Sequence, residues 1–198
     1  RPAAGGPKGY AREYGLALWH TARLAAKVRR EGMVDIVHAC NPPDLLFLVA
    51  LALRPGGARF IFDHHDLVPE LFQSRFPGSR PALYRLTRIV ERLTFAAADA
   101  VISTNESYRR VAIERGKVPA QRVTVVRSAP DLNRFVQQPP DEALRNGKRY
   151  LLAYLGVMGP QDGVDYALRA LKLLRTDVGR DDFHCIFMGA GDSYDDMI

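Results

Sequence analysis

The densest group of potentially reactive side chains in this sequence is Asp63-His64-His65-Asp66. It directly follows the apolar run Phe60-Ile61-Phe62, which is typical of a buried strand. Burying four ionisable groups without partners is costly in free energy. We therefore expect the cluster at a strand end that faces a cleft, because parallel sheets bind ligands at the carboxyl ends of their strands. The chemistry of the protein is expected near this cluster.

Metal binding is the first chemistry that adjacent histidines suggest, but their spacing argues against it. Neighbouring residues of an extended segment point in opposite directions, so His64 and His65 would not easily share one ion. The sequence has no HxH or HExxH spacing, and its two cysteines, Cys40 and Cys185, lie far apart. We expect no metal site in this chain.

Other recognisable signatures are missing as well. The sequence contains no GxSxG elbow and no Walker A loop, which argues against serine-hydrolase and P-loop chemistry. Basic residues are scattered, and there is no helix-turn-helix or RNA-binding signature, so nucleic acid is not an expected partner.

The composition is that of a soluble globular protein. Of 198 residues, 47% are hydrophobic and 25% are charged, and no apolar run reaches the length of a membrane span. The formal charge of +6 permits anionic partners such as nucleotide phosphates or acidic lipid. Both cysteines lie in apolar strand-like runs, which favours reduced, buried thiols in a cytoplasmic protein.

Hydrophobic periodicity predicts alternating strands and helices. The expected strands are 35–40, 59–62, 99–103, 123–126, 150–155 and 183–188, and the expected helices are 14–30, 44–53, 81–97, 106–115 and 164–174. Asn105 is a plausible N-cap and Gly116 a plausible C′ residue of the helix at 106–115. This order predicts an α/β fold with Rossmann-like parallel sheets and helices on both faces.

A Pro- and charge-rich stretch divides the chain into two parts. We expect a first Rossmann-like domain at 1–137, a linker at 138–147 and a second, incomplete Rossmann-like domain at 148–198. A lone strand-helix-strand unit buries little core, so we expect the chain to be a portion of a longer protein. The open edge of the unfinished sheet could pair with another chain and form an oligomer.

Most of the expected strands end in polar or glycine-rich turns. In the first domain these turns hold Asn41, Asp44, Thr104 and Glu106, and in the second they are 156–159 and 189–192. Parallel strands place such turns on one edge, where a ligand can bind. The alternative is purely structural: Asn105 and Asp44 would cap helices, and the glycines would allow tight turns.

The helix expected at 81–97 carries a basic stripe of Arg85, Arg88 and Arg92 opposite Leu86, Ile89, Val90 and Leu93. Such a stripe is most often a solvated face. Contact with an acidic membrane surface is the alternative.

Several motifs in a fixed order resemble a known family. They are Phe62-Asp63-His64-His65-Asp66-Leu67, 101–106, 118–123 leading to Asp131 and Phe135, and 154–166. Together they are similar to the retaining glycosyltransferases of family 4 type, which have the GT-B fold. The resemblance runs from about the second strand to the end of the chain. It implies that residues 1–137 are the later part of the N-terminal, acceptor-side domain and that residues 148–198 are the start of the C-terminal, nucleotide-sugar domain.

The resemblance implies a function and a set of site residues. Enzymes of this family move a hexosyl group from a nucleotide-diphosphate sugar to an acceptor and retain the anomeric configuration, normally without metal or cofactor. It implies a UDP- or GDP-sugar donor and a saccharide or lipid-linked acceptor in surface polysaccharide or glycolipid synthesis. The expected location is cytoplasmic, peripheral on the inner face of the membrane.

His65 aligns best with the family histidine beside the donor sugar, and His64 is the alternative. The residues implied on the acceptor side are Asn41, Asp44, Asp63, His64, Asp66, Glu70, Thr104 and Glu106. The backbone positions implied at the donor phosphates are Gly156, Val157, Gly159, Gly189 and Gly191.

The sequence departs from the family pattern on the donor side. Val157 and Asp162 stand at the positions of an arginine and a lysine, and Ser128-Ala129 replaces Asn-Gly. The family's paired glutamates would follow Ile198, and its first glycine-rich loop would precede Arg1. We therefore expect a central portion that is inactive alone. The alternatives are a non-catalytic interaction module of a GT-B protein and a GT-B nucleotide-sugar epimerase.

Overall fold

The computed structural model describes residues 7–76, 78 and 81–197. Contacts divide the chain into two compact units, Arg1–Ala129 and Pro130–Ile198. No helix in the described part of the chain is long and apolar enough to cross a membrane. The short 3₁₀ helix Glu142–Arg145 lies within the expected linker.

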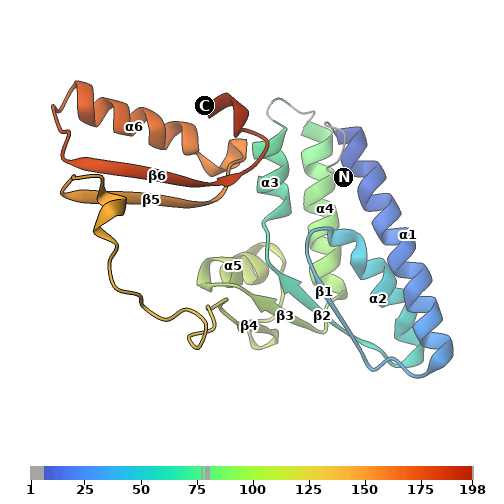
Figure 1. Cartoon of the computed structure of the whole chain (residues 1–198). Coiled ribbons are helices and arrows are strands. Elements are labelled where there is room, and N and C mark those ends of the chain that lie inside the picture. Colours follow the sequence, from blue (N-terminus) through green and yellow to red (C-terminus); the bar gives the residue numbers. More distant parts are fainter. Residues whose placement is uncertain (1–6, 77, 79–80, 198) are drawn as a thin grey trace. The chain divides into compact units, whose positions relative to one another are not determined.

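The first unit alternates helices and parallel strands (Figure 1). Its elements are α1 (Pro7–Glu31), β1 (Ile36–Cys40), α2 (Phe47–Leu53), β2 (Arg59–His64), α3 (Val68–Arg75), α4 (Pro81–Ala97), β3 (Ala100–Ser103), α5 (Glu106–Arg110) and β4 (Val123–Val125). Within the described residues the four strands form one parallel sheet in the order β1-β2-β3-β4. The predicted α/β fold with a parallel sheet flanked by helices is confirmed.

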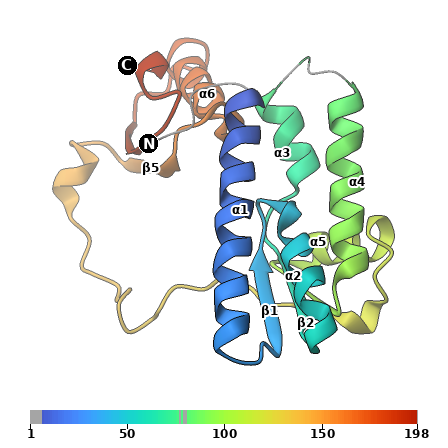
Figure 2. The same cartoon turned by 90° about the vertical axis from the view of Figure 1, so that its right-hand side faces the viewer.

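The core of this unit lies on one face of the sheet. Figure 2 shows α2 and α4 on the same side of β1 and β2. Phe60 and Phe62 are two residues apart in β2, so they point to the same face of the sheet. There they form one hydrophobic cluster with Phe47 of α2 and Phe95 of α4. The alternate side chains of β1 and β2 therefore point to the opposite face, away from this core.

That arrangement corrects the expectation of two buried thiols. Both cysteines are free, but Cys40 is exposed and Cys185 is only partly buried. Cys40 lies on the strand face that this hydrophobic core does not cover. Alternate residues of an apolar strand point away from a core that lies on one face of the sheet, so they can stay exposed.

The expected helix at 106–115 changes geometry midway. Asn105 caps it as predicted, since its side chain accepts a hydrogen bond from the Tyr108 N–H at 3.0 Å. After α5 the chain continues as a π-helical turn, Val111–Arg115. A single π turn of this kind shifts the direction of the side chains that follow it.

Gly116 serves a different purpose from the one predicted. Its φ is −75°, so it does not adopt the left-handed conformation of a C′ glycine, and Lys117 has the positive φ of 58° instead. A Cβ atom on Gly116 would lie 2.6 Å from the carbonyl oxygen of Ala112 and 2.6 Å from the Phe95 ring. Close approach of the π turn to the core therefore requires a glycine here.

The second unit contains β5 (Tyr150–Val157), α6 (Val164–Thr176) and β6 (Phe183–Ala190). Among its described residues the two strands pair in parallel, with Gly156 opposite Gly189. The expected strand-helix-strand order of this unit is thus observed.

Candidate functional site

The side chain of Asn41 organises the carboxyl edge of the first sheet. Its Oδ1 accepts hydrogen bonds from the backbone N–H groups of His65 (2.7 Å) and Asp66 (3.1 Å). Its Nδ2 donates to the Asp66 carbonyl at 2.7 Å and to Asp44 Oδ1 at 3.0 Å. Asn41 is buried, and Pro42 and Pro43 after it carry no N–H. One side chain therefore fixes the turn that carries His65.

His65 and Asp63 form an accessible pair at this edge. His65 Nε2 lies 3.1 Å from Asp63 Oδ1, with 43% of the His65 side chain and 13% of the Asp63 side chain exposed. A carboxylate in contact with one ring nitrogen orients an imidazole. The ring of His65 is thus held by Asp63 and still reachable by a substrate.

His64 points to the other side of the strand and belongs to the core. It is fully buried, and its ring lies 5.0 Å from Phe95 and 5.2 Å from Tyr108, centroid to centroid. Burial, assisted by the nearby positive charge of Arg115, lowers the pKa of His64 to about 4. His64 is therefore neutral near pH 7. The expectation that the two adjacent histidines diverge agrees with this geometry.

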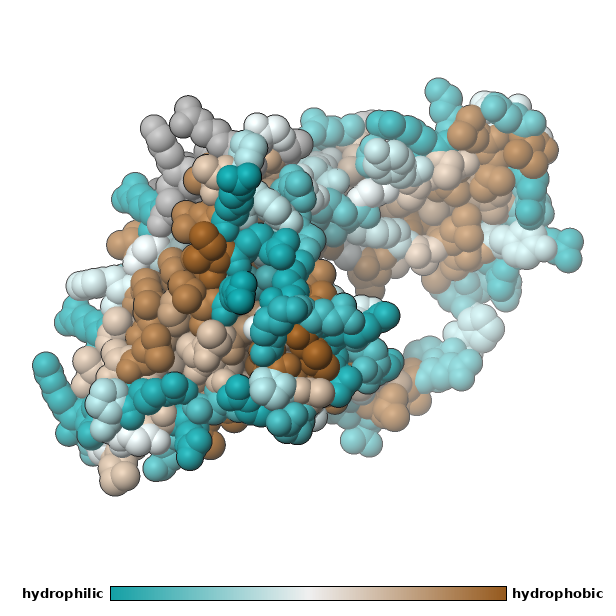
Figure 3. All heavy atoms as spheres, turned by 180° about the vertical axis from the view of Figure 1, so that it is seen from behind, coloured by the Kyte–Doolittle hydropathy of each residue, from teal (hydrophilic) through white to brown (hydrophobic). Residues whose placement is uncertain are grey.

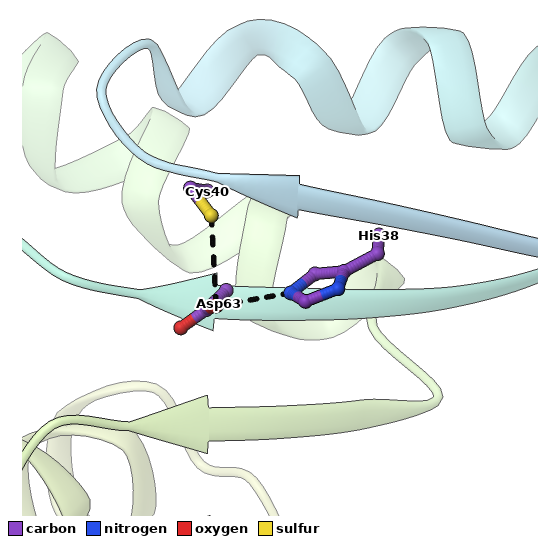
Figure 4. A group of neighbouring side chains, drawn as sticks. All are labelled: His38, Cys40 and Asp63. Carbon is purple, nitrogen blue, oxygen red and sulfur yellow. Dashed lines mark hydrogen bonds and ion pairs between the residues drawn. The ribbon is translucent and has the colours of Figure 1, made fainter. Parts of the chain in front are cut away.

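Asp63 also contacts two side chains of the neighbouring strand. His38 Nε2 lies 2.9 Å from Asp63 Oδ2, and the Cys40 thiol donates to the same oxygen at 3.5 Å. Figure 4 shows both β1 side chains turned toward Asp63 on β2. Burial, followed by the negative charge of Asp63, raises the pKa of the Cys40 thiol. His38 and Cys40 were not predicted as site residues, although residues two apart in a strand point to the same face.

Asp44 lies inward of Asn41 and does not cap a helix. The cap of its 3₁₀ turn is Pro43, and Asp44 Oδ2 is buried with no hydrogen-bond partner among the residues that the structure describes. Burial raises the pKa of Asp44 to about 7; the Asn41 hydrogen bond opposes this, and the charges of Glu91 and Asp66 add to it. The capping interpretation of Asp44 is wrong because its carboxyl group turns to Asn41 instead.

Replacing Asp44 by asparagine should remove a pH dependence of stability. The folded-state pKa of about 7 exceeds the unfolded value of 3.8, so the folded protein retains a proton that the unfolded chain loses. The resulting stability is complete below about pH 4 and is lost as pH rises through about 7. Between about pH 5 and pH 8, Asp44→Asn should gain on the order of 2 kcal/mol relative to wild type.

Urea denaturation of both proteins across this pH range measures that gain as a change in the free energy of unfolding. Asp35→Asn, at an exposed position before β1, is the matched control and should follow the wild-type pH profile. Wild-type and Asp44→Asn profiles that run parallel would show that Asp44 titrates normally.

Glu70, on α3, is the more exposed member of an ion-pair group that extends into the interior, with 43% of its side chain exposed. Arg115, at the end of the π turn, donates to both carboxylate oxygens of Glu70 and to Glu91 Oε1 on α4, the last at 2.5 Å. Only 3% of the Glu91 side chain and 18% of the Arg115 side chain are exposed. Burial raises the pKa of Glu91 even though Arg115 opposes it. Arg115 was not predicted as a site residue because its partners lie 45 and 24 positions away in the chain.

The remaining first-unit candidates lie around the start of α5. Thr104 Oγ1 accepts a hydrogen bond from Asn105 Nδ2 at 3.3 Å. Glu106 is exposed and forms a loose ion pair of 3.9 Å with Arg109. Neither contact connects them to the group around Asn41.

An apolar cavity of about 300 Å³ opens beside the Asn41 turn. It lies between that turn and helices α3 and α4, and its walls include Pro43, Leu71, Phe72, Leu86 and Val90. A cavity lined mainly by apolar side chains with a few polar groups at one end is a common form of ligand site.

In the second unit the predicted glycines allow close backbone contact. A Cβ atom on Gly189 would lie 1.9 Å from the Gly156 carbonyl oxygen, and one on Gly191 would lie 2.5 Å from that of Met158. The Gly159 N–H donates to Asp162 Oδ2 at 2.8 Å, and the Val157 side chain is exposed. Asp162 therefore occupies one backbone donor of this turn and adds a negative charge to it.

Comparison with known proteins identifies the family of this chain. The model of Glycosyltransferase Family 4 matches residues 3–134, which are 132 of the 198 residues and include every strand of the first unit. No curated protein matches the chain. The matched region contains the Asn41 turn, Asp63 and His65, so the edge described above lies within a glycosyltransferase domain. The chain belongs to Glycosyltransferase Family 4.

Proposed function

We propose that the full-length protein transfers a hexosyl group from a nucleotide-diphosphate sugar to an acceptor with retention of configuration, and that His65 lies at the reaction centre. The observation that carries this proposal is the turn held by Asn41, which presents His65 at the carboxyl end of β2 inside the family match. Glycosyl transfer develops positive charge on the sugar ring and negative charge on the leaving diphosphate. A fixed polar group beside the ring suits that change of charge.

The geometry favours His65 over His64 for this role. The exposed ring of His65 can approach a sugar, whereas His64 is enclosed by Phe62, Phe95 and Tyr108. Asp63 supports the proposal because it holds the His65 ring on one side and leaves the rest of the ring accessible.

We propose an acceptor with an apolar portion, on the acceptor side formed by Asn41, Asp44 and Asp66. The cavity beside the Asn41 turn supports this, because its apolar walls fit a hydrocarbon chain better than a sugar. Glu70 contributes to this side by fixing α3 through Arg115.

An acceptor with an apolar portion would lie in a membrane, and helix α4 has side chains that could bind an acidic membrane surface. Leu86, Ile89 and Leu93 of α4 are about half exposed, and Arg85 and Arg92 are exposed on the same helix. Figure 3 shows an apolar band bordered by hydrophilic side chains on this unit. Apolar and cationic side chains on one helix favour binding to anionic lipid. We therefore propose a cytoplasmic protein at the inner face of the membrane.

A second candidate function is a non-catalytic module of a GT-B protein. The contact between Asp162 and the Gly159 N–H favours it, since a carboxylate repels a diphosphate and occupies a donor that a phosphate would need. The catalytic proposal requires the donor phosphates to be bound by other groups of the second domain.

Incubation of the full-length protein with a series of UDP- and GDP-sugars and a membrane-lipid extract tests the two functions. The catalytic proposal expects release of UDP or GDP that depends on the extract, with the anomeric configuration of the product retained in its NMR spectrum. Calorimetry with UDP and GDP completes the comparison. No nucleotide release and no nucleotide binding would overturn the catalytic proposal and support the module.

A further inference from the structure

The sheet face opposite the core brings together three side chains of different chemistry. His38 and Cys40 are two residues apart in β1, so both side chains point to this face. Cys40 lies opposite Asp63 of β2 in the strand register. A thiol, an imidazole and a carboxylate therefore meet across two adjacent strands (Figure 4).

The distances among these groups are close to those of a metal site. His38 Nε2 is 2.9 Å and Cys40 Sγ is 3.5 Å from Asp63 Oδ2, and the three atoms lie within 4.8 Å of one another. Tetrahedral zinc with bonds of about 2.0–2.3 Å separates its ligand atoms by about 3.3–3.8 Å. Small side-chain movements on a half-open surface would bring all three atoms to that spacing.

The alternative is a simple ion pair between His38 and Asp63. Two observations favour a metal site over this ion pair. Asp63 receives contacts from three sides, from His38, Cys40 and His65, so these groups converge on one carboxylate. Its Oδ1 is also buried and forms no hydrogen bond within the described part of the chain, while His65 Nε2 lies 3.1 Å away. A zinc ion bound to the adjacent Oδ2 would bring positive charge to the same carboxylate group, one oxygen of which is buried without a hydrogen bond.

We propose that His38 Nε2, Cys40 Sγ and Asp63 Oδ2 bind a zinc ion at the ends of β1 and β2. These are three of the ligand types that zinc prefers, and two of them, the imidazole and the thiolate, select it over magnesium or calcium. On binding, the Cys40 thiol releases its proton to solvent and the sulfur forms the bond to zinc. The fourth position remains open to water. The ion would tie the two strands together next to His65.

Spectroscopy with Co²⁺ as the probe tests the site without any assay of transfer. The full-length protein, free of a histidine tag, is stripped of metal with a chelator, kept reduced with a phosphine and titrated with Co²⁺. We expect a sulfur-to-cobalt charge-transfer band in the near ultraviolet and intense visible bands of tetrahedral cobalt. Both should saturate at one equivalent and disappear when Zn²⁺ is added.

Variants assign the ligands. Cys40→Ser should abolish the charge-transfer band, and His38→Gln and Asp63→Asn should each weaken Co²⁺ binding at least about tenfold. Cys185→Ser and His184→Gln, at the adjacent thiol and imidazole of β6, are matched controls and should bind Co²⁺ like wild type. Cys40→Ser is informative even if Asp63→Asn does not fold, because Cys40 is exposed and its replacement leaves the core intact.

A second measurement is the thermal unfolding temperature, which Zn²⁺ should raise in wild type and in the two controls but not in Cys40→Ser. The proposal is overturned by absence of the cobalt bands, by their persistence in Cys40→Ser, or by their loss in Cys185→Ser.

Discussion

Replacing Arg115 by methionine is expected to lower the free energy of unfolding by about 3–5 kcal/mol. Arg115 connects Glu70 of α3 to Glu91 of α4, and its removal leaves the almost fully buried carboxylate of Glu91 with only the longer, 4.0 Å ion pair to Arg88. Breaking a buried pair costs more than removing both charges, because the remaining ion stays away from water. The loss should appear in urea denaturation near pH 7.

Two further variants show whether the weakly compensated charge of Glu91 causes the loss. Arg115→Met combined with Glu91→Met should recover most of the stability, since an apolar pair of similar volume replaces the buried ions and the half-exposed Glu70 can be hydrated. Arg109→Met, which breaks the exposed 3.9 Å pair with Glu106, is the matched control and should change stability by less than about 0.5 kcal/mol. A double variant as unstable as Arg115→Met would locate the cost in lost packing instead.

The pH dependence supplies an independent check of Arg115→Met. Burial already raises the pKa of Glu91, and loss of Arg115 raises it further. A raised folded-state pKa means that stability is greatest when the carboxyl group is protonated and falls as pH rises. The deficit of Arg115→Met should therefore be smaller at about pH 5 than at about pH 7.

Replacing His65 by alanine is expected to lower kcat/KM for glycosyl transfer by the full-length protein about 10²–10³-fold. This expectation rests on the proposed position of His65 beside the donor sugar. The folded state should change little, because 43% of this side chain is exposed and its polar contact is to Asp63. The rate loss and an unchanged unfolding curve together would distinguish a catalytic residue from a structural one.

Initial rates over a range of nucleotide-sugar concentrations, from which kcat/KM is obtained, measure this effect. His20→Ala, at an exposed histidine of α1, is the control and should retain the wild-type rate. His65→Gln, which keeps a hydrogen-bonding side chain, should fall between wild type and alanine. Undiminished turnover of His65→Ala would remove His65 from the mechanism.

The fold could be predicted from the sequence because its signals are local. Apolar runs and helical spacing predicted each strand of both units, and Asn105 was identified as an N-cap from its place before a helix. Gly116 shows the limit of such reasoning. Its residue type suggested a left-handed turn, whereas the structure requires it for contact with Phe95, which lies on another helix.

The site was predictable only in part, for the same reason. The Asp63–Asp66 cluster is contiguous, so it was visible in the sequence. The side chains that give it structure come from elsewhere: Asn41 and His38 lie more than twenty residues earlier, and Arg115 follows Glu91 by 24 positions. Strand register and the π turn bring these residues together, and neither has a pattern in a single sequence. A single sequence also does not show which face of a sheet is exposed. The apolar runs around the two cysteines therefore led to the wrong prediction of buried thiols.

Pro42, directly after Asn41, protects the turn at His65 from deamidation of Asn41. Asparagine deamidates when the backbone nitrogen of the next residue attacks the side-chain carbonyl, and the nitrogen of Pro42 has no hydrogen to lose in that reaction. Conversion of Asn41 to aspartate would turn its Nδ2 donor into an oxygen facing the Asp66 carbonyl and Asp44 Oδ1, both of which are acceptors. The proline thus preserves, over the lifetime of the molecule, the single amide on which the position of His65 depends.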